Sequence, residues 1–495
     1  MLTSVVNRRR AGQTAVFRLR MPPAFDLPAT VDPNLTDSAR GDLPVGVRWE
    51  SETLVSAVAI DAVRPTPRAH TVAASRPVVG VEPTVDLAVL HRFRRSARVP
   101  VTVDLVVSDH RYCGAGPLAR AYRDTLGPLP IASARRVAAV IRVRAADAAA
   151  GSSSAPAVAA LRTTAILTRR LAALLASRGL RATVCTADDL AALTDRLLGP
   201  GLMPPATSTG IGLSTDATSV SGNGVSWRTF ALSRESGPAA VRGAAAGDAV
   251  STTTVLRLSG APHAPVLGGM LGVTEFPAAG RVWRTPSADL DPLTGRQAAA
   301  LRDRLPVAAP TVDLPRLPVD PISLARWAFR LGDDGALIGA DAAGRAVTVP
   351  LAGSARHPVV VDVDESLAAL LIGRCIAGGA SISVHTDEPA RWERLVGAVG
   401  DHGVLALGAT TGTGALAEVA LVDETDARDP ERSRRFRLVP EQTREAGRRD
   451  PWAVIRGAST DPGRITLDIG PTAIDLASVA GAAECALLPV PAEPV

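Results

Sequence analysis

Residues 137–143 read VAAVIRV, residues 156–178 read PAVAALRTTAILTRRLAALLASR, and residues 181–185 read RATVC. The short stretches at either end are rich in small and β-branched apolar residues, which is typical of buried strands. The long middle stretch is typical of a helix, and Gly179 follows it as a stop signal. A strand, a helix and a strand in this order predict parallel pairing of the two strands through a right-handed crossover.

The predicted helix carries its apolar residues on one stripe. Leu161, Ala165, Ala172 and Leu175 fall on one face, while the arginines can lie off it. A second helix is expected up to Leu198, because Thr186 followed by Asp189 resembles a capping box with the shorter acid.

A second unit of the same kind is predicted nearer the C-terminus. Strands are expected at 359–363, 381–385 and 404–407, with helices at 365–376 and 389–399 between them. The sequence therefore predicts an α/β protein with two mixed, partly parallel units.

Hairpins are expected to extend both units, at 47–60 in the first and 336–349 in the second. Further elements are expected at the following places: helices at 85–93, 117–126 and 293–305; strands at 101–107, 227–232, 252–258, 452–455, 465–469 and 486–489; loops at 199–224 and 423–437.

Proline and glycine content suggests where the units meet. Residues 307–320 contain three prolines, and further prolines flank them at 306 and 321, so a boundary is placed there. The expected organisation is an extended N-terminal segment at 1–40, an α/β domain at 41–306, a linker at 307–334 and a C-terminal α/β domain at 335–495.

The composition removes several classes of protein. All 54 basic residues are arginines, since the chain of 495 residues contains no lysine. A Walker A loop, a protein kinase and a Schiff-base enzyme each require a lysine, so these classes are excluded. The arginines are scattered and aromatic residues make up only 3%, which argues against nucleic-acid binding.

Four cysteines, Cys113, Cys185, Cys375 and Cys485, are too far apart in sequence for a C-x-x-C motif. They are expected to be reduced and to be small, buried apolar residues. No stretch provides the roughly twenty uninterrupted apolar residues of a membrane-spanning helix. The most apolar segments are interrupted by Arg374, and by Asp475 and Glu484.

The most enzyme-like feature is Asp362-Val363-Asp364, at the end of a predicted strand. A D-x-D there can hold a divalent metal and a nucleotide-sugar diphosphate. The alternative function is therefore a metal-dependent, glycosyltransferase-like enzyme that uses Asp362 and Asp364. The simpler interpretation, which we favour, is that Asp364 caps the next helix and Asp362 faces solvent.

Other candidate sites are weaker. Gly408, Gly412 and Gly414 could form an anion-binding turn, but a plain loop is the simpler interpretation. The run His385 to Glu388 lacks metal-ligand spacing, and Gly210-Ile211-Gly212 lacks a third glycine. We therefore assign no catalytic, cofactor-binding or metal residues, and expect no cofactor and no small-molecule substrate.

Several blocks, taken in order, resemble one protein family. They are 45–49 with 54–56, 127–130, 161–180, 186–190, 227–232, 252–258, 293–297 and 334–339. Over roughly residues 40–400 this set is similar to EccE, a component of the type VII (ESX) secretion system of actinobacteria.

The resemblance implies a non-catalytic scaffold subunit of a membrane complex at the cytoplasmic face of the inner membrane. It implies assembly with EccB, EccC and EccD components, with EccC as the ATPase, and a part in the export of WXG100-type substrates. The family usually begins with two transmembrane helices, which this sequence lacks, so attachment is expected through partners or through helices missing from a truncated start.

Overall fold

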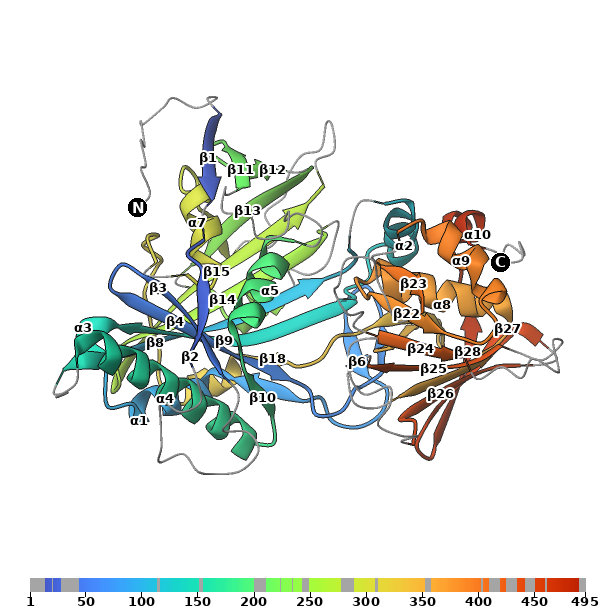
Figure 1. The fold of residues 1–495 in the computed structure, drawn as a ribbon, viewed down its shortest axis with the longest axis horizontal. Coiled ribbons are helices and arrows are strands. Elements are labelled where there is room, and N and C mark those ends of the chain that lie inside the picture. The colour runs from blue at the N-terminus through green and yellow to red at the C-terminus, as the bar shows by residue number, and fades with distance from the viewer. Residues whose placement is uncertain are drawn as a thin grey trace.

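The computed structural model describes residues 14–19, 21–27, 44–113, 116–150, 155–199, 211–222, 224–233, 235–242, 249–276, 289–307, 310–351, 358–401, 404–408, 419–423, 434–440, 450–458 and 461–488. Two large β-sheets with flanking helices lie in the two halves of the molecule (Figure 1). The mixed α/β class predicted from the sequence is confirmed.

The first sheet has fourteen strands among the described residues. They are β1 (Ala15–Leu19), β2 (Ala24–Leu27), β3 (Val45–Glu50), β4 (Thr53–Asp61), β8 (Val101–His110), β9 (Ala134–Arg144), β10 (Arg181–Val184), β11 (Ile211–Thr215), β12 (Val220–Gly222), β13 (Val225–Leu232), β14 (Ser251–Ala261), β15 (Ala264–Glu275), β16 (Leu290–Pro292) and β17 (Leu317–Pro318). Its central order is β13-β15-β14-β8-β9-β4-β3.

Helices cover both faces of this sheet. They are α1 (Leu87–Ser96), α3 (Ala145–Ala149), α4 (Pro156–Ser177), α5 (Ala187–Leu198), α6 (Pro238–Arg242), α7 (Gln297–Asp303) and the 3₁₀ helix η3 (Ser323–Arg326). Alternate residues of each central strand point to opposite faces, so the strands bury apolar side chains in two separate cores.

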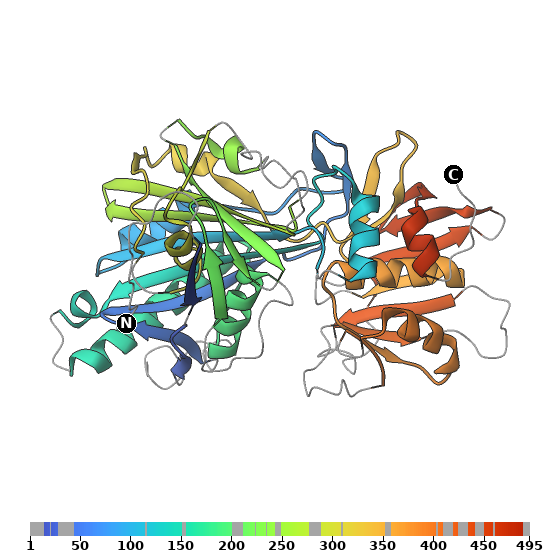
Figure 2. The ribbon, with the colours of Figure 1, turned by 90° about the horizontal axis from the view of Figure 1, so that it is seen from above.

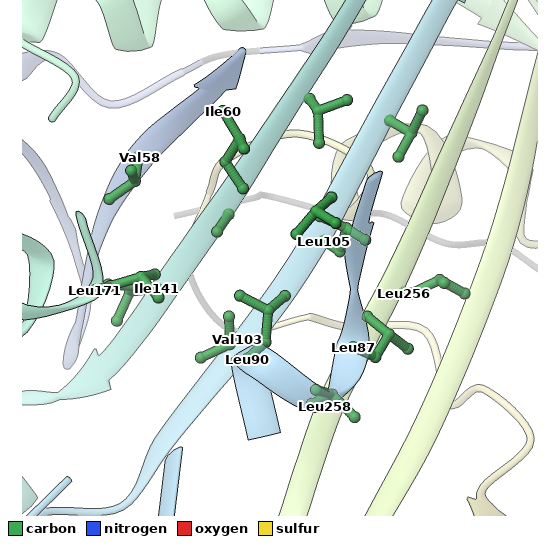
Figure 3. Packing of buried hydrophobic residues seen from close by; sticks show 14 of the residues in the cluster. Val58, Ile60, Leu87, Leu90, Val103, Leu105, Ile141, Leu171, Leu256 and Leu258 are labelled. Atoms are coloured by element: carbon green, nitrogen blue, oxygen red, sulfur yellow. The ribbon is translucent and has the colours of Figure 1, made fainter. Parts of the chain in front are cut away.

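The larger core lies under α1 and α4. Leu105 and Ile141 from the sheet pack with Leu90 of α1 and Leu171 of α4 (Figure 3). The opposite face carries Val106 and packs with residues of α5 and α7.

The second sheet has twelve strands among the described residues. They are β5 (Arg68–His70), β6 (Ser75–Pro77), β19 (Ala336–Ala340), β20 (Ala346–Val349), β21 (Val359–Val363), β22 (Ile382–His385), β23 (Leu405–Leu407), β24 (Val419–Asp423), β25 (Arg434–Pro440), β26 (Ala453–Ala458), β27 (Asp461–Ile469) and β28 (Thr472–Ser478).

The helices beside it are α2 (Pro117–Leu126), α8 (Glu365–Ala377), α9 (Ala390–Val399) and α10 (Ala482–Leu487) (Figure 2). A separate two-stranded sheet pairs β7 (Thr84–Asp86) with β18 (Ala328–Arg330). Although β5 and β6 come early in the chain, they lie in the second sheet, because β5 pairs with β20.

The parallel pairing predicted between residues 137–143 and 181–185 is wrong. The strands β9 and β10 both form, but each pairs antiparallel with β4, which lies between them. The hairpin β3–β4 supplies a strand whose residues are buried on both faces, so β4 takes the position beside β9.

The second predicted unit is correct in its elements but only partly in their pairing. The strands β22 and β23 are parallel neighbours. β21 is separated from β22 by β24 and β25, which were not predicted as strands. The predicted loop 423–437 thus includes the start of β25, and residues 424–433 lie outside the described part of the chain.

Three other predictions need correction. The predicted loop 199–224 contains β11 and β12, and residues 200–210 lie outside the described residues. The predicted helix 293–305 is shorter, because Gly295 has a φ of 74° and α7 begins only at Gln297. The predicted strand 486–489 is occupied by the end of α10, and residues 489–495 are not described.

The segment predicted as a linker at 307–334 packs against the first sheet. Leu317, Leu324, Trp327 and Phe329 are buried in the larger core. The division into two domains at the predicted boundaries stays a prediction.

Candidate functional site

A cavity of about 150 Å³ lies where the two sheets approach each other. It is lined by the end of β8, the start of β9, α5, the segment before β19 and the last turn of α8. The lining residues used below are Cys113, Arg136, Asp333, Arg374, Cys375 and Gly379. We call this region, with the buried ion pairs around it, the junction.

The last turn of α8 closely approaches the chain that follows β8. The amide of Cys113 donates to the carbonyl of Ala377 at 2.7 Å. A Cβ atom on Gly379, whose φ is 102°, would come within 2.5 Å of the Cys113 sulfur. Glycine is therefore required there both for its backbone conformation and for the contact.

One ion pair in the junction is fully buried. The guanidinium of Arg374 in α8 donates to both carboxylate oxygens of Glu484 in α10, at 2.9 and 2.7 Å. Its remaining donors reach the carbonyls of Leu337 and Val479, at 2.8 and 2.6 Å. The Glu484 carboxylate also accepts from Thr125 of α2 at 2.8 Å. The pair therefore joins α2, α8, α10 and β19.

A second buried carboxylate, Asp334, gathers groups from both halves of the molecule. It accepts from Arg330 at 2.6 and 2.9 Å, and from the amide of Ala132, just before β9, at 2.6 Å. Arg68 of β5 lies 3.2 Å from it. Because this carboxylate is fully buried, the arginines around it provide the compensation that a buried charge requires.

The neighbouring carboxyl groups Asp333 and Asp334 differ in pKa. For Asp334, burial alone would raise the pKa, but Arg330, His70 and the nearby arginines outweigh it and lower the pKa to about 2. For Asp333, burial raises the pKa to about 6, although Arg136 acts in the opposite direction. Asp333 is therefore the cavity group that changes charge nearest to neutral pH.

The buried charges of the junction contact one another and the backbone of neighbouring elements. Arg374, Glu484 and Asp334 use their polar atoms in hydrogen bonds between elements. The cavity is also smaller than the roughly 300–1,000 Å³ of common ligand pockets. Burial raises the pKa of the Cys375 thiol to about 12, so this cavity cysteine is not an activated nucleophile at neutral pH.

The structure assigns Asp364 to a helix cap, as the simpler interpretation predicted. Its carboxylate accepts from the amide of Leu367 at 2.9 Å, at the first turn of α8. The expectation that Asp362 faces solvent needs correction. This residue is half-buried in β21, opposite Arg435 on one side and Arg456 on the other.

The other sequence candidates are dispersed. His385 ends β22, and its Nε2 lies 3.0 Å from the Ser383 hydroxyl. Gly408 is described and has a φ of 83°, whereas Gly210, Gly412 and Gly414 lie outside the described residues. Within the part of the chain that the structure describes, no group of three or more His, Cys, Asp or Glu residues could hold a metal ion.

The four cysteines are free thiols. Cys185 and Cys375 are buried, as expected for small apolar residues, while Cys113 and Cys485 are half-buried. The prediction that all four are buried is therefore correct for two.

The sequence analysis missed the junction, although two of its charges were noted. Arg374 and Glu484 were considered only because each interrupts an apolar segment. A single charge in such a segment needs a partner of opposite sign, and each is the other's partner. Arg330 and Asp334 also pair, but Arg330 ends strand β18 and no helix joins the two residues, so their spacing carried no such signal.

Among the described residues, no helix combines the length and the apolar character needed to cross a membrane. A search of curated proteins found no match to the chain. Residues 131–232 match the model of a family described as "Putative type VII ESX secretion system translocon, EccE". This match spans roughly a fifth of the chain and runs from just before β9 to the end of β13.

Proposed function

We propose that this chain, which carries an EccE family domain over residues 131–232, is a non-catalytic structural subunit of a type VII secretion complex at the inner membrane. The observation that carries the proposal is the position of the domain in the fold. The matched residues supply β9 at the centre of the first sheet, α4 over one face and α5 over the other. The resemblance therefore concerns the core of the first sheet.

The junction supports a structural role. Its buried charges are used to hold elements together, and the one D-x-D of the second sheet contributes a helix cap. A subunit that transmits position between partners needs its parts to move as one body, and the Asp334 and Arg374 contacts provide such coupling.

The partners that we propose are EccB-, EccC- and EccD-like components, with no nucleic acid and no small-molecule substrate. The proposed location is the cytoplasmic face of the inner membrane. We further propose the predicted domain organisation, 41–306 and 335–495 as α/β domains with 307–334 between them, amended by the presence of β5 and β6 in the second sheet.

The test is co-purification. A tagged copy of the chain is expressed in its own host, membranes are solubilised in mild detergent, and the tagged protein is isolated and run on a native gel. The expected result is co-migration with EccC- and EccD-like proteins in one large assembly. Recovery of the tagged protein free of every membrane complex would overturn the proposal.

A further inference from the structure

Arg304 follows α7 directly and is almost fully buried. Only 1% of the surface of Arg304 is exposed. None of its three guanidinium nitrogens has a hydrogen-bond partner among the described residues. Other buried arginines differ. Arg142 and Arg257 both donate to the buried carboxylate of Asp104, and Arg374 donates to Glu484.

The guanidinium lies against the backbone of the first sheet. A Cβ atom on Gly272 of β15 would overlap the Arg304 Nη1 atom. The glycine therefore leaves a space over the strand, which the guanidinium fills. Any larger residue at position 272 would displace it.

A second unpartnered polar group lies beside this space. Thr229 of β13 is directly opposite Gly272 in the antiparallel register, so its side chain points to the same face of the sheet. Its hydroxyl is buried and has no hydrogen-bond partner among the described residues. Since the Cβ positions of such opposed residues are about 4.5–5.5 Å apart, one small group could contact both the hydroxyl and the guanidinium.

The charge on Arg304 persists at neutral pH. Burial lowers its pKa to about 10, which still leaves the guanidinium protonated. A buried unpaired charge carries a large desolvation penalty, and guanidinium N–H groups and a hydroxyl can all donate. A set of donors around a cation matches an anion rich in acceptor oxygens, which guanidinium binds through two parallel hydrogen bonds.

We propose that Arg304 and Thr229 form a buried binding site for a small inorganic oxyanion, such as phosphate. The anion would join β13, β15 and the end of α7, and would stabilise this part of the first sheet. The proposal does not depend on the role in secretion.

The test compares thermal unfolding of the purified full chain in HEPES buffer with unfolding in sodium phosphate of equal ionic strength. Phosphate stabilises many proteins without a specific site, so the informative quantity is the difference between wild type and Arg304→Met. We expect phosphate to raise the wild-type midpoint by about 3 °C or more beyond the rise in the variant. Equal shifts would overturn the proposal.

Two further variants keep the result interpretable. Arg302→Met removes a neighbouring arginine that pairs with Glu50, and should keep the full phosphate response. Thr229→Val keeps the shape of the side chain and loses the hydroxyl, so its response should be reduced. If Arg304→Met does not fold, a wild-type response in Thr229→Val contradicts the proposal.

A chloride arm at the same ionic strength tests the class of anion. The oxyanion assignment predicts that chloride gives a smaller wild-type shift than phosphate, because a spherical ion cannot offer a separate acceptor atom to each of two parallel N–H groups. An equal shift with chloride would reject it.

Discussion

Two buried carboxylates, Asp104 and Asp334, are both surrounded by arginines. The contacts of Asp104 lie within one sheet, whereas those of Asp334 come from both halves of the molecule. Asp104 lies in β8 and is held by Arg142 of β9 and Arg257 of β14, so its whole cluster belongs to one sheet. Asp334 is held by Arg330 and lies near Arg68 of the second sheet, and it also accepts from the amide that precedes β9.

The comparison separates two uses of the same chemistry. A carboxylate between two arginines strengthens a single sheet when all three lie on neighbouring strands. The same arrangement couples two sheets when its members come from different halves. In both cases removing one partner is costly, because the other charges remain buried and uncompensated.

The largest effect is expected from Asp334→Asn. This change leaves the arginines around residue 334 without their counter-charge, and the free energy of unfolding should fall by about 3–5 kcal/mol. Calorimetry should also show two separated transitions, since the variant weakens the contact between the sheets.

The matched control is Asp104→Asn. It should lower stability by a comparable amount while the variant keeps a single transition, because its cluster lies within one sheet. A single transition in both variants would remove the distinction between the two clusters.

A smaller effect is expected from Glu484→Gln, which leaves Arg374 buried with a neutral partner. The free energy of unfolding should fall by about 3 kcal/mol in urea denaturation. The double variant Arg374→Met with Glu484→Leu should recover most of this loss, since apolar replacement of a buried pair is often neutral. If the double variant is no more stable than Glu484→Gln, the pair is not an isolated two-residue interaction.

The pH dependence of stability should differ between the two adjacent carboxyl groups. The pKa of Asp334 is lowered to about 2, so its contribution is present above pH 4 and is lost as the pH falls toward 2. The pKa of Asp333 is raised to about 6, so the folded protein binds more protons than the unfolded chain between about pH 4 and 6. Asp333 therefore lowers stability as the pH rises through that interval.

Asp333→Asn should remove the fall in stability between about pH 4 and 6. The loss of stability below pH 4, which comes from Asp334, should remain. At pH 7 the variant should be more stable than wild type by up to about 3 kcal/mol. The measurement is the urea midpoint from pH 3 to 8, and parallel curves for the two proteins between pH 4 and 6 would contradict the assignment.

The smallest effect is expected from Asp364→Ala, which removes a helix cap outside both clusters. Stability should fall by about 1 kcal/mol, and recovery of the secretion complex should not change. Addition of Mn²⁺ or a nucleotide sugar should leave the unfolding temperature of the wild type unchanged. A rise with either ligand would revive the glycosyltransferase-like alternative.

Local patterns predicted individual elements well and their pairing less well. The capping box at Thr186 and Asp189 and the strand, helix and hairpin periodicities depend on neighbouring residues, and these elements formed. The place of β4 between β9 and β10 depends on a hairpin some 80 residues earlier in the chain, which no local pattern encodes.

The sequence predicted one detail of the D-x-D segment and none of the contacts of the junction. The cap formed by Asp364 was foreseen because Asp before a helix has a local signature. The pairing of Arg374 with Glu484 joins residues 110 positions apart, and the groups that contact Asp334 come from three separate segments. Such contacts are created by the tertiary fold, so the sequence showed the charges without their partners.

The placement of β5 and β6 also constrains how the protein can be cut and how it is made. β5 pairs with β20 and β6 pairs with β5, yet both leave the ribosome more than 250 residues before β20. A fragment beginning at residue 335 would therefore expose the edge of β20 as an open template for another chain. During synthesis, β5 and β6 cannot join the second sheet until β20 has been made.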